Sequence, residues 1–473
     1  MKLAYSLCAL SPQAYKGGLY MYDLSSKFLT FYNDYVVLSS DEKQKLYDKK
    51  KLNTNRLKEG LKEYNNDNNT SYRIAEDCIQ GSVATSTVIQ NEENDYDIDV
   101  AIVFDKENLG NKGPSSTRNM VADALGRKTK QFNTEPEVKT SCVRIKYADG
   151  YHIDFAVYRR YYDYDKEEYI YEHAGSDWTI RELRGLTNWF DLENNNSNGN
   201  LRKVVRLSKM FCKSRESWKN MPSGLNQTVL CDEQLSNYDR IDELFYFTMK
   251  NIVDRLDNNT TVLAPVDNHR NLTLRKSDID KMVKWKNRLK SKIGDLNVLF
   301  DDDCTEEEAM EAWFYFFNND FWSSDKLSKN LIHCNAVSNN TRLFSDTEQF
   351  IEDLYPVCIR YNCKIRCDVV GDGFRNKPIS EYLKYFRHYL PHNLKIMCEI
   401  STNCPKPYAV FWKVKNVGPE AKKRDQIRGQ ILKRGEYIEE KTLFFGNHYI
   451  ECYVVKNNEC VAIDRVEIPI GRS

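Results

Sequence analysis

The hydrophobic residues in the first part of this 473-residue chain follow two different spacings. Between residues 22 and 64, apolar side chains recur at helical spacing among charged ones, which predicts two helices. Residues 97–104 and 151–158 instead show the patterns of β-strands. Together these patterns predict an α+β fold, in which a small mixed sheet is flanked by helices that brace it.

The segments between these elements extend the predicted sheet. Residues 106–116 are rich in Gly, Asn and Ser, which predicts a loop, and residues 117–130 have a helical pattern. Residues 138–147 predict another strand, and the Asp149-Gly150 pair that follows it is a strong hairpin turn. The strand at 151–158 is therefore expected to return antiparallel to its predecessor.

Helical patterns dominate the middle of the chain. Residues 201–213, 239–256, 277–293 and 306–321 all place apolar side chains at helical spacing. The last of these segments carries a stripe of Trp and Phe, which normally marks a buried core face. These segments predict a helical lobe that follows the sheet.

The hydrophobic period changes after an Asn- and Ser-rich stretch at 330–346, which we interpret as a linker. Residues 394–400, 408–414 and 448–455 are strand-like, and a turn at 457–458 leads into a further apolar run. The C-terminal part is therefore predicted to be a smaller, mainly β domain.

Composition narrows the range of partners. Lys+Arg and Asp+Glu are equal in number at 69 each, so no overall basic field indicates binding to a long nucleic acid. A mononucleotide needs only local positive charge. The 14 cysteines are scattered without a Cys-x-x-Cys and His pattern, which favours reduced thiols in a cytoplasmic protein over a zinc site.

No apolar run is long enough to predict a membrane-spanning helix. Residues 1–10 faintly resemble a signal peptide, but the apolar core is short and no clean cleavage pattern follows it. We therefore interpret residues 1–20 as an N-terminal extension and discount export.

The most informative chemistry lies in residues 80–105. The Gly81-Ser82 turn offers backbone N–H groups and a hydroxyl to a phosphate, at the expected start of a helix. Asp97 and Asp99 open the next strand and point to the same face. Two carboxylates held so close repel each other unless a cation lies between them, and Mg²⁺ commonly uses such ligands together with substrate phosphates.

A third carboxylate, Asp154, lies among apolar residues in the strand at 151–158. Beside Asp97 and Asp99 it would complete a site for two ions, Mg²⁺ or alternatively Mn²⁺. One ion would lower the pKa of an attacking hydroxyl and the other would hold the leaving phosphates. Asp95 shares the alternation and is a rival for the pair, but the apolar run begins directly after Asp99. An isolated Asp-x-Asp is usually a solvated strand end; the ordered set favours catalysis.

The helix predicted at 201–213 is basic as well as amphipathic. Lys209 lies about two turns after Arg202, and Arg206 and Lys213 follow a similar track. In a phosphate-handling enzyme such a helix would supply point charges that clamp triphosphate oxygens. The alternative is an ordinary solvated basic face, and both interpretations stay open for any single lysine.

The Gly-Ser turn, the Asp-x-Asp strand and the later strand Asp together resemble the polymerase-β-like nucleotidyltransferases. The Arg-x-x-Lys of the basic helix and the Met-Pro-Ser-Gly segment at 221–224 resemble, more narrowly, the cGAS/DncV-like nucleotidyltransferases (CD-NTases). This resemblance implies a catalytic lobe and a helical lobe with nucleotides in the cleft, and places Lys209 and Ser82 against the donor triphosphate. Gly81, Arg206, Lys213 and Ser223 complete the candidate nucleotide-binding residues.

The segments 412–416, 428–431 and 448–452 resemble the AGS-C-type sensor domain that is fused to bacterial CD-NTases. The resemblance implies a domain that binds a ligand or a protein partner; a passive stabilising domain is the alternative. The expected organisation is an extension (1–20), a nucleotidyltransferase (21–330, with the catalytic lobe to about 200 and the helical lobe at 201–330), a linker (331–345) and the sensor domain (346–473).

The function implied by the resemblance is Mg²⁺-dependent joining of NTPs, ATP among them, into a cyclic di- or oligonucleotide with release of pyrophosphate. The setting it implies is bacterial anti-phage signalling (CBASS), with the product read by an unidentified effector. One alternative keeps the chemistry and changes the acceptor to an RNA end, a protein or a small molecule. Another is a catalytically silent nucleotide-binding regulator, against which the three carboxylates argue.

Overall fold

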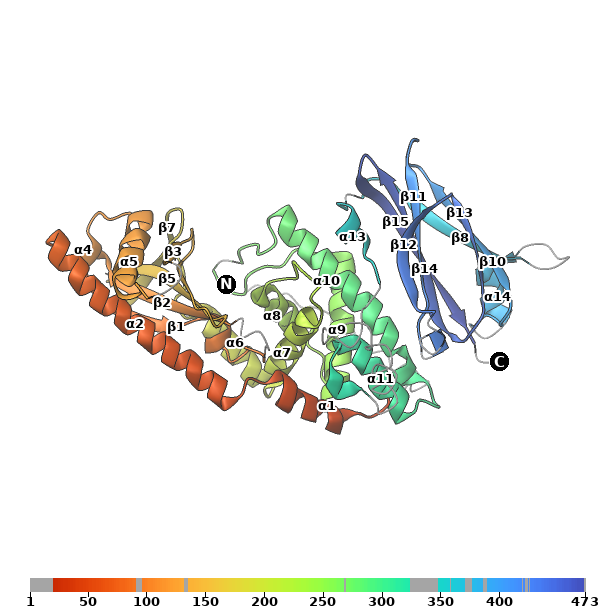
Figure 1. The fold of residues 1–473 in the computed structure, drawn as a ribbon, viewed down its shortest axis with the longest axis horizontal. Coiled ribbons are helices and arrows are strands. Elements are labelled where there is room, and N and C mark those ends of the chain that lie inside the picture. Colours follow the sequence, from red (N-terminus) through yellow and green to blue (C-terminus); the bar gives the residue numbers. More distant parts are fainter. Residues whose placement is uncertain are drawn as a thin grey trace. The chain divides into compact units, whose positions relative to one another are not determined.

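Figure 1 shows the computed structural model of the chain, which describes residues 20–90, 96–131, 135–267, 269–323, 348–357, 359–370, 377–385, 389–418, 420–421, 424 and 426–471. The described residues form two compact units, one within Ser25–Ser291 and the other within Lys292–Ser473 and Met1–Leu24. The expected linker, the rival carboxylate Asp95 and all of the expected extension except Tyr20 lie outside the described residues. The domain boundaries therefore stay predictions.

A mixed sheet forms the core of the Ser25–Ser291 unit, as expected from the sequence. Its described strands have the order β1-β2-β5-β4-β3, and β6 and β7 continue from the second half of β5. β2 and β5 are parallel, whereas β5 returns antiparallel to β4 after the Asp149-Gly150 turn. The strands are β1 (Glu76–Ile79), β2 (Asp97–Asp105), β3 (Glu137–Val138), β4 (Val143–Lys146), β5 (His152–Asp163), β6 (Glu168–Ala174) and β7 (Trp178–Ile180).

Two local predictions around this sheet were wrong. Residues 106–116 contain the short helix α4 (Lys106–Leu109) and the start of α5 (Pro114–Lys128). A proline in the first turn of a helix loses no hydrogen bond, so α5 begins at Pro114, ahead of its apolar stripe. The single strand expected at 138–147 is divided into β3 and β4, which pair with each other as a tight hairpin.

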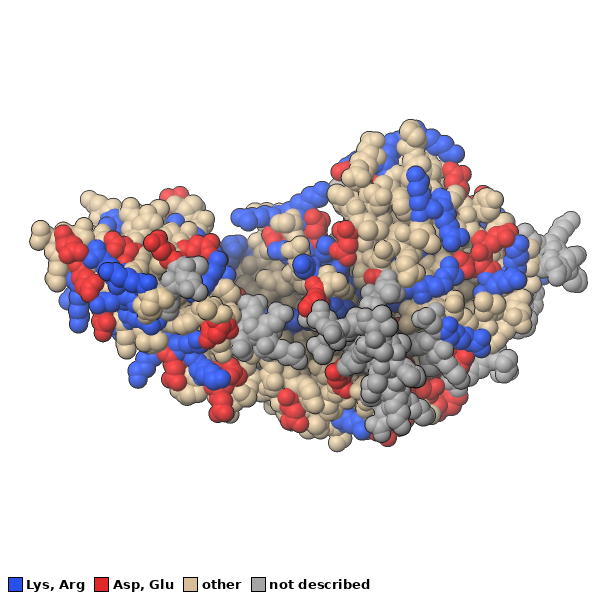
Figure 2. Space-filling view, in the orientation of Figure 1, with Lys and Arg blue, Asp and Glu red and all other residues tan. Residues whose placement is uncertain are grey.

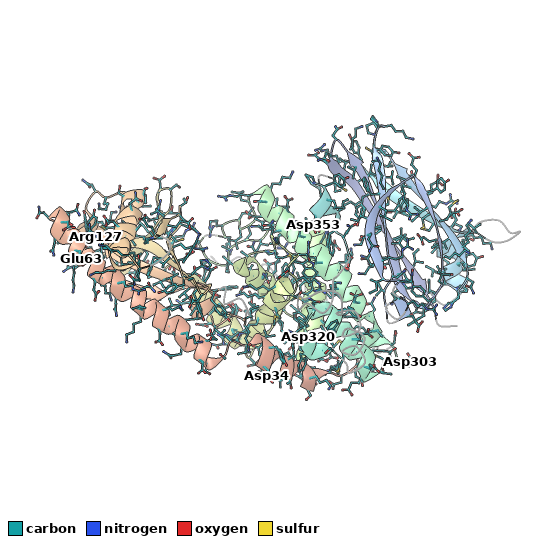
Figure 3. All side chains as sticks on the ribbon, viewed as in Figure 1. Asp34, Glu63, Arg127, Asp303, Asp320 and Asp353 are labelled. Carbon is teal, nitrogen blue, oxygen red and sulfur yellow. A yellow bond between two sulfur atoms is a disulfide. The ribbon has the colours of Figure 1, made fainter. Side chains whose placement is uncertain are left out.

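The helix α2 (Ser40–Asn68) packs along α5 and braces the sheet. The two helices approach closely at Gly60, where a Cβ atom would lie 1.8 Å from the carbonyl oxygen of Ala124. Ion pairs connect the same helices at their surface: Lys128 contacts Glu63 at 2.5 Å and Arg127 contacts Asp67 at 2.5 Å. Figure 3 labels Glu63 and Arg127 where α2 and α5 lie side by side.

Helices make up the rest of this unit. The helices predicted at 201–213, 239–256 and 277–293 are confirmed as α7, α9 and α10, whereas α6 was not predicted. α7 packs against α8, α9 and the short π-helix η1. The elements are α1 (Ser25–Phe31), η1 (Tyr32–Val36), α3 (Gly81–Ala84), α6 (Gly185–Asn196), α7 (Asn200–Lys213), α8 (Gly224–Glu233), α9 (Ile241–Asn258) and α10 (Lys276–Asp295).

The second unit begins with a small aromatic cluster. The helix α11 (Glu306–Phe317) starts at a capping box formed by Thr305 and Glu308. Its Trp313 stacks on Phe317 and packs beside Trp322, so the Trp/Phe stripe is core, as expected. The 3₁₀ helices η2 (Leu296–Phe300) and η3 (Asp320–Trp322) flank α11.

The C-terminal part of this unit is a sandwich of two four-stranded antiparallel sheets around a shared apolar core. One sheet has the order β13-β10-β8-β9 and the other β12-β11-β14-β15. The elements are α13 (Ile351–Leu354), β8 (Cys363–Val370), β9 (Lys377–Pro378), α14 (Ile379–Tyr385), β10 (Lys395–Thr402), β11 (Ala409–Lys415), β12 (Arg428–Arg434), β13 (Tyr437–Lys441), β14 (Gly446–Lys456) and β15 (Glu459–Ile470).

One pair of cysteines departs from the expectation of reduced thiols. Cys367 on β8 and Cys398 on β10 lie directly opposite each other and form a disulfide. The sequence could not indicate this pair because the two cysteines are 31 residues apart and meet only through the strand register.

The surface agrees with the balanced composition. Figure 2 shows acidic and basic side chains interspersed over the visible face. Within the described ranges, the structure contains no helix with the length and apolar character needed to cross a bilayer.

A buried carboxylate organises the outer face of the β12-β11-β14-β15 sheet. Glu348 is fully buried, and its two oxygens accept contacts from Lys413 at 2.6 Å and Lys415 at 2.9 Å. The Tyr449 hydroxyl donates a further hydrogen bond at 2.8 Å. Burial by itself would raise the pKa of Glu348, but Lys413, Lys415 and the nearby Lys292 lower it well below its usual range. Glu348 is therefore ionised and compensates buried cations.

Glu348→Gln is expected to destabilise the C-terminal sandwich by about 3–5 kcal/mol, because it leaves buried ammonium groups without their carboxylate. Urea unfolding, combined with hydrogen exchange of β11 and β14, measures this loss. The matched control is Glu439→Gln on β13, whose exposed pair with Lys395 is worth at most about 1 kcal/mol. Equal effects of the two substitutions would contradict the assignment.

Candidate functional site

The Gly81-Ser82 turn is docked directly on the strand that carries the carboxylates. It connects β1 to the four-residue helix α3, and the Gln80 N–H donates to the Asp99 carbonyl at 2.8 Å. Gly81 has a left-handed φ of +63°, and a Cβ atom there would lie 2.0 Å from Asp99 Oδ2. Only glycine fits this position, because both the backbone conformation and the carboxylate exclude a side chain.

The three candidate carboxylates lie on adjacent strands. In the parallel pair β2–β5, Asp99 is the register partner of Asp154, and Asp97 pairs with His152. Residues two apart on a strand share a face, and register partners on neighbouring parallel strands point the same way. The structure therefore brings Asp97, Asp99 and Asp154 to one face of the sheet, at one end of β2.

The electrostatics of this face show a shortage of positive charge. The pKa of Asp99 is raised to about 6, mainly by burial and in addition by the neighbouring Asp154 and Asp97 carboxylates. Burial also acts to raise the pKa of Asp154, but Arg144 overcomes this and lowers it. A hard divalent cation would relieve the repulsion at Asp99, so the donor chemistry of the three carboxylates fits such an ion.

Arg144 on β4 forms part of this charge balance. Its Nε lies 2.6 Å from Asp154 Oδ1 and its Nη2 lies 2.7 Å from Asp154 Oδ2, a fork that engages both oxygens. Nη2 also lies 3.4 Å from Asp97 Oδ1. Among the described residues, no three His, Cys, Asp or Glu side chains are arranged to hold a metal ion.

The basic face of α7 holds the turn that follows α3. Three basic side chains, at positions i, i+4 and i+7 of the helix, donate to three consecutive carbonyl groups of the turn. These contacts are Arg202 Nε to Thr85 O at 3.0 Å, Arg206 Nη2 to Ser86 O at 2.6 Å and Lys209 Nζ to Thr87 O at 3.0 Å. The spacing places all three on one face of the helix, and the face fixes the position of the turn.

Lys209 lies close enough to Asp99 for the two charges to influence each other. The pKa of its ammonium group is lowered to about 8, mainly by burial and also by the nearby Lys213 and Arg206, while Asp99 acts in the opposite direction. A buried ammonium group beside a cavity gains most from an anionic ligand, because that ligand restores the charge compensation that water cannot provide.

A cavity of about 650 Å³ connects these groups within the Ser25–Ser291 unit. Six of the sequence-predicted residues line it: Gly81, Ser82, Asp97, Asp99, Lys209 and Lys213. In the described part of the chain, Asp154, Arg206 and Ser223 are not among the lining residues. Asp154 lies beside Asp99, and Arg144 donates to both of its oxygens. Arg206 donates to the Tyr32 hydroxyl at 2.7 Å as well as to the turn. Ser223 caps α8, where its side chain accepts the Asn226 N–H.

The sequence analysis missed the aromatic wall of this cavity. Trp189 and Phe190 come from α6, which was not predicted, and Tyr96 and Trp218 come from segments outside the predicted helices and strands. The adjacent Trp-Phe pair in a polar stretch was the available signal, but its place beside the carboxylates depends on tertiary packing.

Two family models match the chain. Residues 75–158 match the model described as "Cyclic GMP-AMP synthase DncV-like, nucleotidyltransferase domain". Residues 345–471 match "Adenylyl/Guanylyl and SMODS C-terminal sensor domain" (AGS-C). These two matches support a CD-NTase with a C-terminal AGS-C sensor domain. The nucleotidyltransferase match spans β1, the Gly-Ser turn, β2 and the part of β5 that carries Asp154.

Known proteins similar to this CD-NTase agree with that fold. A cytidylate cyclase from Staphylococcus aureus is 29% identical over 99 residues, which cover 20% of this chain and 23% of the relative. The Vibrio cholerae cyclic AMP-GMP synthase DncV aligns at a TM-score of 0.51 and 16% identity, covering 63% of this chain and 97% of that one. The structure of DncV in complex with GTP and 5MTHFGLU2 aligns at a TM-score of 0.52 and 15% identity, covering 64% of this chain and 97% of that one. At these identities the structural likeness concerns the fold alone.

The lowered pKa of Lys209 predicts that the affinity of this site for a nucleotide depends on pH. Lys209 is charged below about pH 8 and loses its charge as the pH rises through that value. Affinity for a non-hydrolysable ATP analogue, measured by calorimetry, is expected to fall about tenfold between roughly pH 7.5 and 9.5. Lys209→Arg keeps its charge over this range, so its affinity should stay level. A level profile for the unaltered protein would contradict a role of Lys209 in phosphate binding.

Arg144→Gln is expected to strengthen Mn²⁺ binding about tenfold, because Arg144 competes with a cation for the Asp154 oxygens. The same substitution should lower the thermal stability of the metal-free protein, since three carboxylates lose their cation. Mn²⁺ titration followed by electron paramagnetic resonance, together with thermal unfolding, measures both changes. Arg160→Gln on β5, which removes an ion pair with Asp105, is the matched control. Weaker Mn²⁺ binding by Arg144→Gln would instead show that Arg144 orients Asp154 for the metal.

Proposed function

We propose that this chain joins nucleoside triphosphates, ATP among them, into a cyclic di- or oligonucleotide and releases pyrophosphate. The observation that carries the proposal is the contact between the Gly81-Ser82 turn and Asp99. A phosphate held at the turn would lie next to the carboxylates, inside a domain that matches the DncV-like nucleotidyltransferases. Enzymes of this kind generally depend on a divalent metal ion.

The proposed roles follow from where the structure places each side chain. Asp97, Asp99 and Asp154 would hold Mg²⁺, or alternatively Mn²⁺, which when bound activates the acceptor hydroxyl and neutralises the leaving phosphates. The Gly81-Ser82 turn would bind the donor phosphates through its N–H groups and hydroxyl. Lys209 would compensate their charge from one side of the cavity.

The remaining lining residues would position the nucleotide. Lys213 would add a second positive charge beside Lys209. Trp189 and Phe190 offer aromatic surface on which a base can stack. The sequence also suggested Arg206 and Ser223 as nucleotide-binding residues. Arg206 donates to the Ser86 carbonyl and Ser223 caps α8, so we propose that they support the site by holding the turn at residues 85–87 and the start of α8 in place.

The family resemblance suggests a cytoplasmic role in bacterial anti-phage signalling, with the AGS-C domain responding to a ligand or partner and an effector reading the product. A second candidate reaction is cyclisation of a single nucleotide, which the similarity to a cytidylate cyclase favours. Both reactions use the same carboxylates and differ only in whether the acceptor hydroxyl belongs to the donor nucleotide itself.

Asp97→Asn combined with Asp99→Asn is expected to lower product formation by at least about a thousandfold, because the pair supplies the charge that holds the metal ions. Labelled NTPs with Mg²⁺, followed by phosphatase treatment and mass spectrometry, measure the product. A phosphatase-resistant product indicates a cyclic linkage, and its mass separates one nucleotide from two or more.

Asp105→Asn, at the other end of β2, is the matched control and should retain activity. Thermal unfolding of each variant verifies that it is folded. Unchanged turnover in the double variant would defeat the assignment of the carboxylates. Product that forms only with added RNA, protein or a small-molecule acceptor would favour the alternative transferase, and an inactive wild-type protein that binds NTP would favour the regulator.

A further inference from the structure

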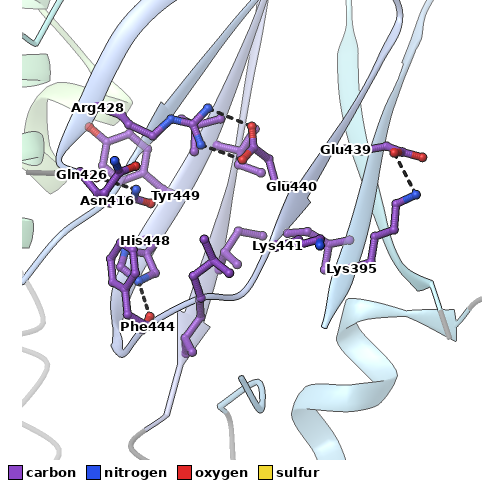
Figure 4. Close-up of a pocket in the computed structure, with 16 residues that line it drawn as sticks. Lys395, Asn416, Gln426, Arg428, Glu439, Glu440, Lys441, Phe444, His448 and Tyr449 are labelled. Atoms are coloured by element: carbon purple, nitrogen blue, oxygen red, sulfur yellow. Dashed lines mark hydrogen bonds and ion pairs between the residues drawn. The ribbon is translucent and has the colours of Figure 1, made fainter. Parts of the chain in front are cut away.

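A second cavity, of about 350 Å³, lies between the two sheets of the C-terminal sandwich. Figure 4 shows the residues that line it. Aliphatic side chains from both sheets form its walls, with an aromatic ring from the loop before β14. These residues are Ile396, Val414, Ile450, Ile468, Ile470 and Phe444. The volume is in the range of small-molecule sites, which begin at about 300 Å³.

One side of this cavity is polar and bridges the two sheets. β12 and β13 are the edge strands of different sheets, and Arg428 on β12 reaches Glu440 on β13. Arg428 Nη1 lies 2.6 Å from Glu440 Oε2, and Arg428 Nη2 lies 2.9 Å from Glu440 Oε1, so the ion pair is bidentate. Asn416 and Gln426 add amide groups on the same side as Arg428 (Figure 4).

The backbone directs Arg428 into this position. Arg428 has a left-handed φ of +59° and is followed by Gly429 at +105°. The register between β11 and β12 shifts at this point, which is the signature of a bulge. Bulges re-aim a side chain, and left-handed backbone at a non-glycine residue carries a conformational cost that is concentrated at functional sites.

Among the described residues that line the cavity interior, no charge is uncompensated. Arg428 is neutralised by Glu440. His448 is buried, and burial lowers the pKa of its imidazole; its two nitrogens lie 3.0 Å from the Val417 N and 2.9 Å from the Phe444 carbonyl oxygen. At the rim, Lys395 pairs with Glu439, and Lys441 is exposed to solvent, which screens it.

We propose that this cavity binds an uncharged, planar heteroaromatic ring that carries donors and acceptors along one edge, as a purine base does. The apolar lining, which comes mainly from the β12-β11-β14-β15 sheet with Ile396 on the other sheet, suits the faces of a ring. The Arg428–Glu440 pair offers both donors and acceptors to its edge. A carboxylate ligand would have to compete with Glu440 for Arg428, and an aliphatic chain would cover the polar side without satisfying it. The inference is independent of the proposed catalytic function.

Calorimetric titration of the full chain with adenosine and guanosine tests the proposal, with decanoate as the anionic, aliphatic comparison. At least one nucleoside is expected to bind with a Kd below about 1 mM. Glu440→Gln should weaken that binding at least about tenfold and strengthen decanoate binding, because Arg428 loses its partner. Glu436→Gln, which alters an exposed ion pair with Lys406 near the turn before β13, is the matched control. It should leave both the nucleoside Kd and the decanoate Kd unchanged.

A second variant separates this cavity from the catalytic one. Leu443 lines the sandwich cavity and is 53% exposed, so Leu443→Trp narrows the entrance without changing the core. It should weaken nucleoside binding, whereas Asp97→Asn with Asp99→Asn should not. The proposal is overturned if neither nucleoside binds, if decanoate binds the unaltered protein more tightly than both, or if Glu440→Gln and Leu443→Trp leave the nucleoside Kd unchanged.

Discussion

The candidate site depends on the hydrogen bonds between the basic face of α7 and the turn after α3. Three cations at one-turn intervals donate to three consecutive carbonyls of residues 85–87. Carbonyls in an irregular turn have no strand or helix partner, and each would otherwise need water or another donor. The helix satisfies them with charged donors, which make stronger hydrogen bonds than neutral ones. These carbonyls directly follow α3 (Gly81–Ala84), and Gly81 at the start of α3 abuts Asp99. The α7 contacts therefore fix the phosphate-binding backbone relative to the carboxylates.

Charge compensation is the second constraint, and each unit meets it differently. At the sheet, burial and the neighbouring carboxylates raise the pKa of Asp99 even with Arg144 nearby. In the sandwich, Glu348 is surrounded by lysines and is held ionised by them. A site that must accept a cation benefits from a local excess of acid, whereas a structural network is stable only when its charges balance.

The sequence predicted many of the longer elements because their hydrophobic periods were strong. α2, α7, α9 and α10 have apolar stripes at helical spacing, and β2, β5, β10, β11 and β14 alternate or form apolar runs. It failed where local signals were weak or were overridden. α6 is short and polar, α4 lies in a segment rich in loop-forming residues, and β3 and β4 are separated by a turn that no Gly or Pro marks.

The sequence by itself determined which chemistry was available: a glycine-serine turn, three aspartates in two strands and a basic helix. Those residue types and spacings are local properties of the chain. Only the tertiary structure decided that Arg144 engages Asp154, that Arg206 holds a carbonyl, and that a cavity separates two sheets beside Arg428. The physical reason is that a charged side chain takes whichever partner packing brings within hydrogen-bond distance, and strand register and helix docking set that partner across many residues of sequence.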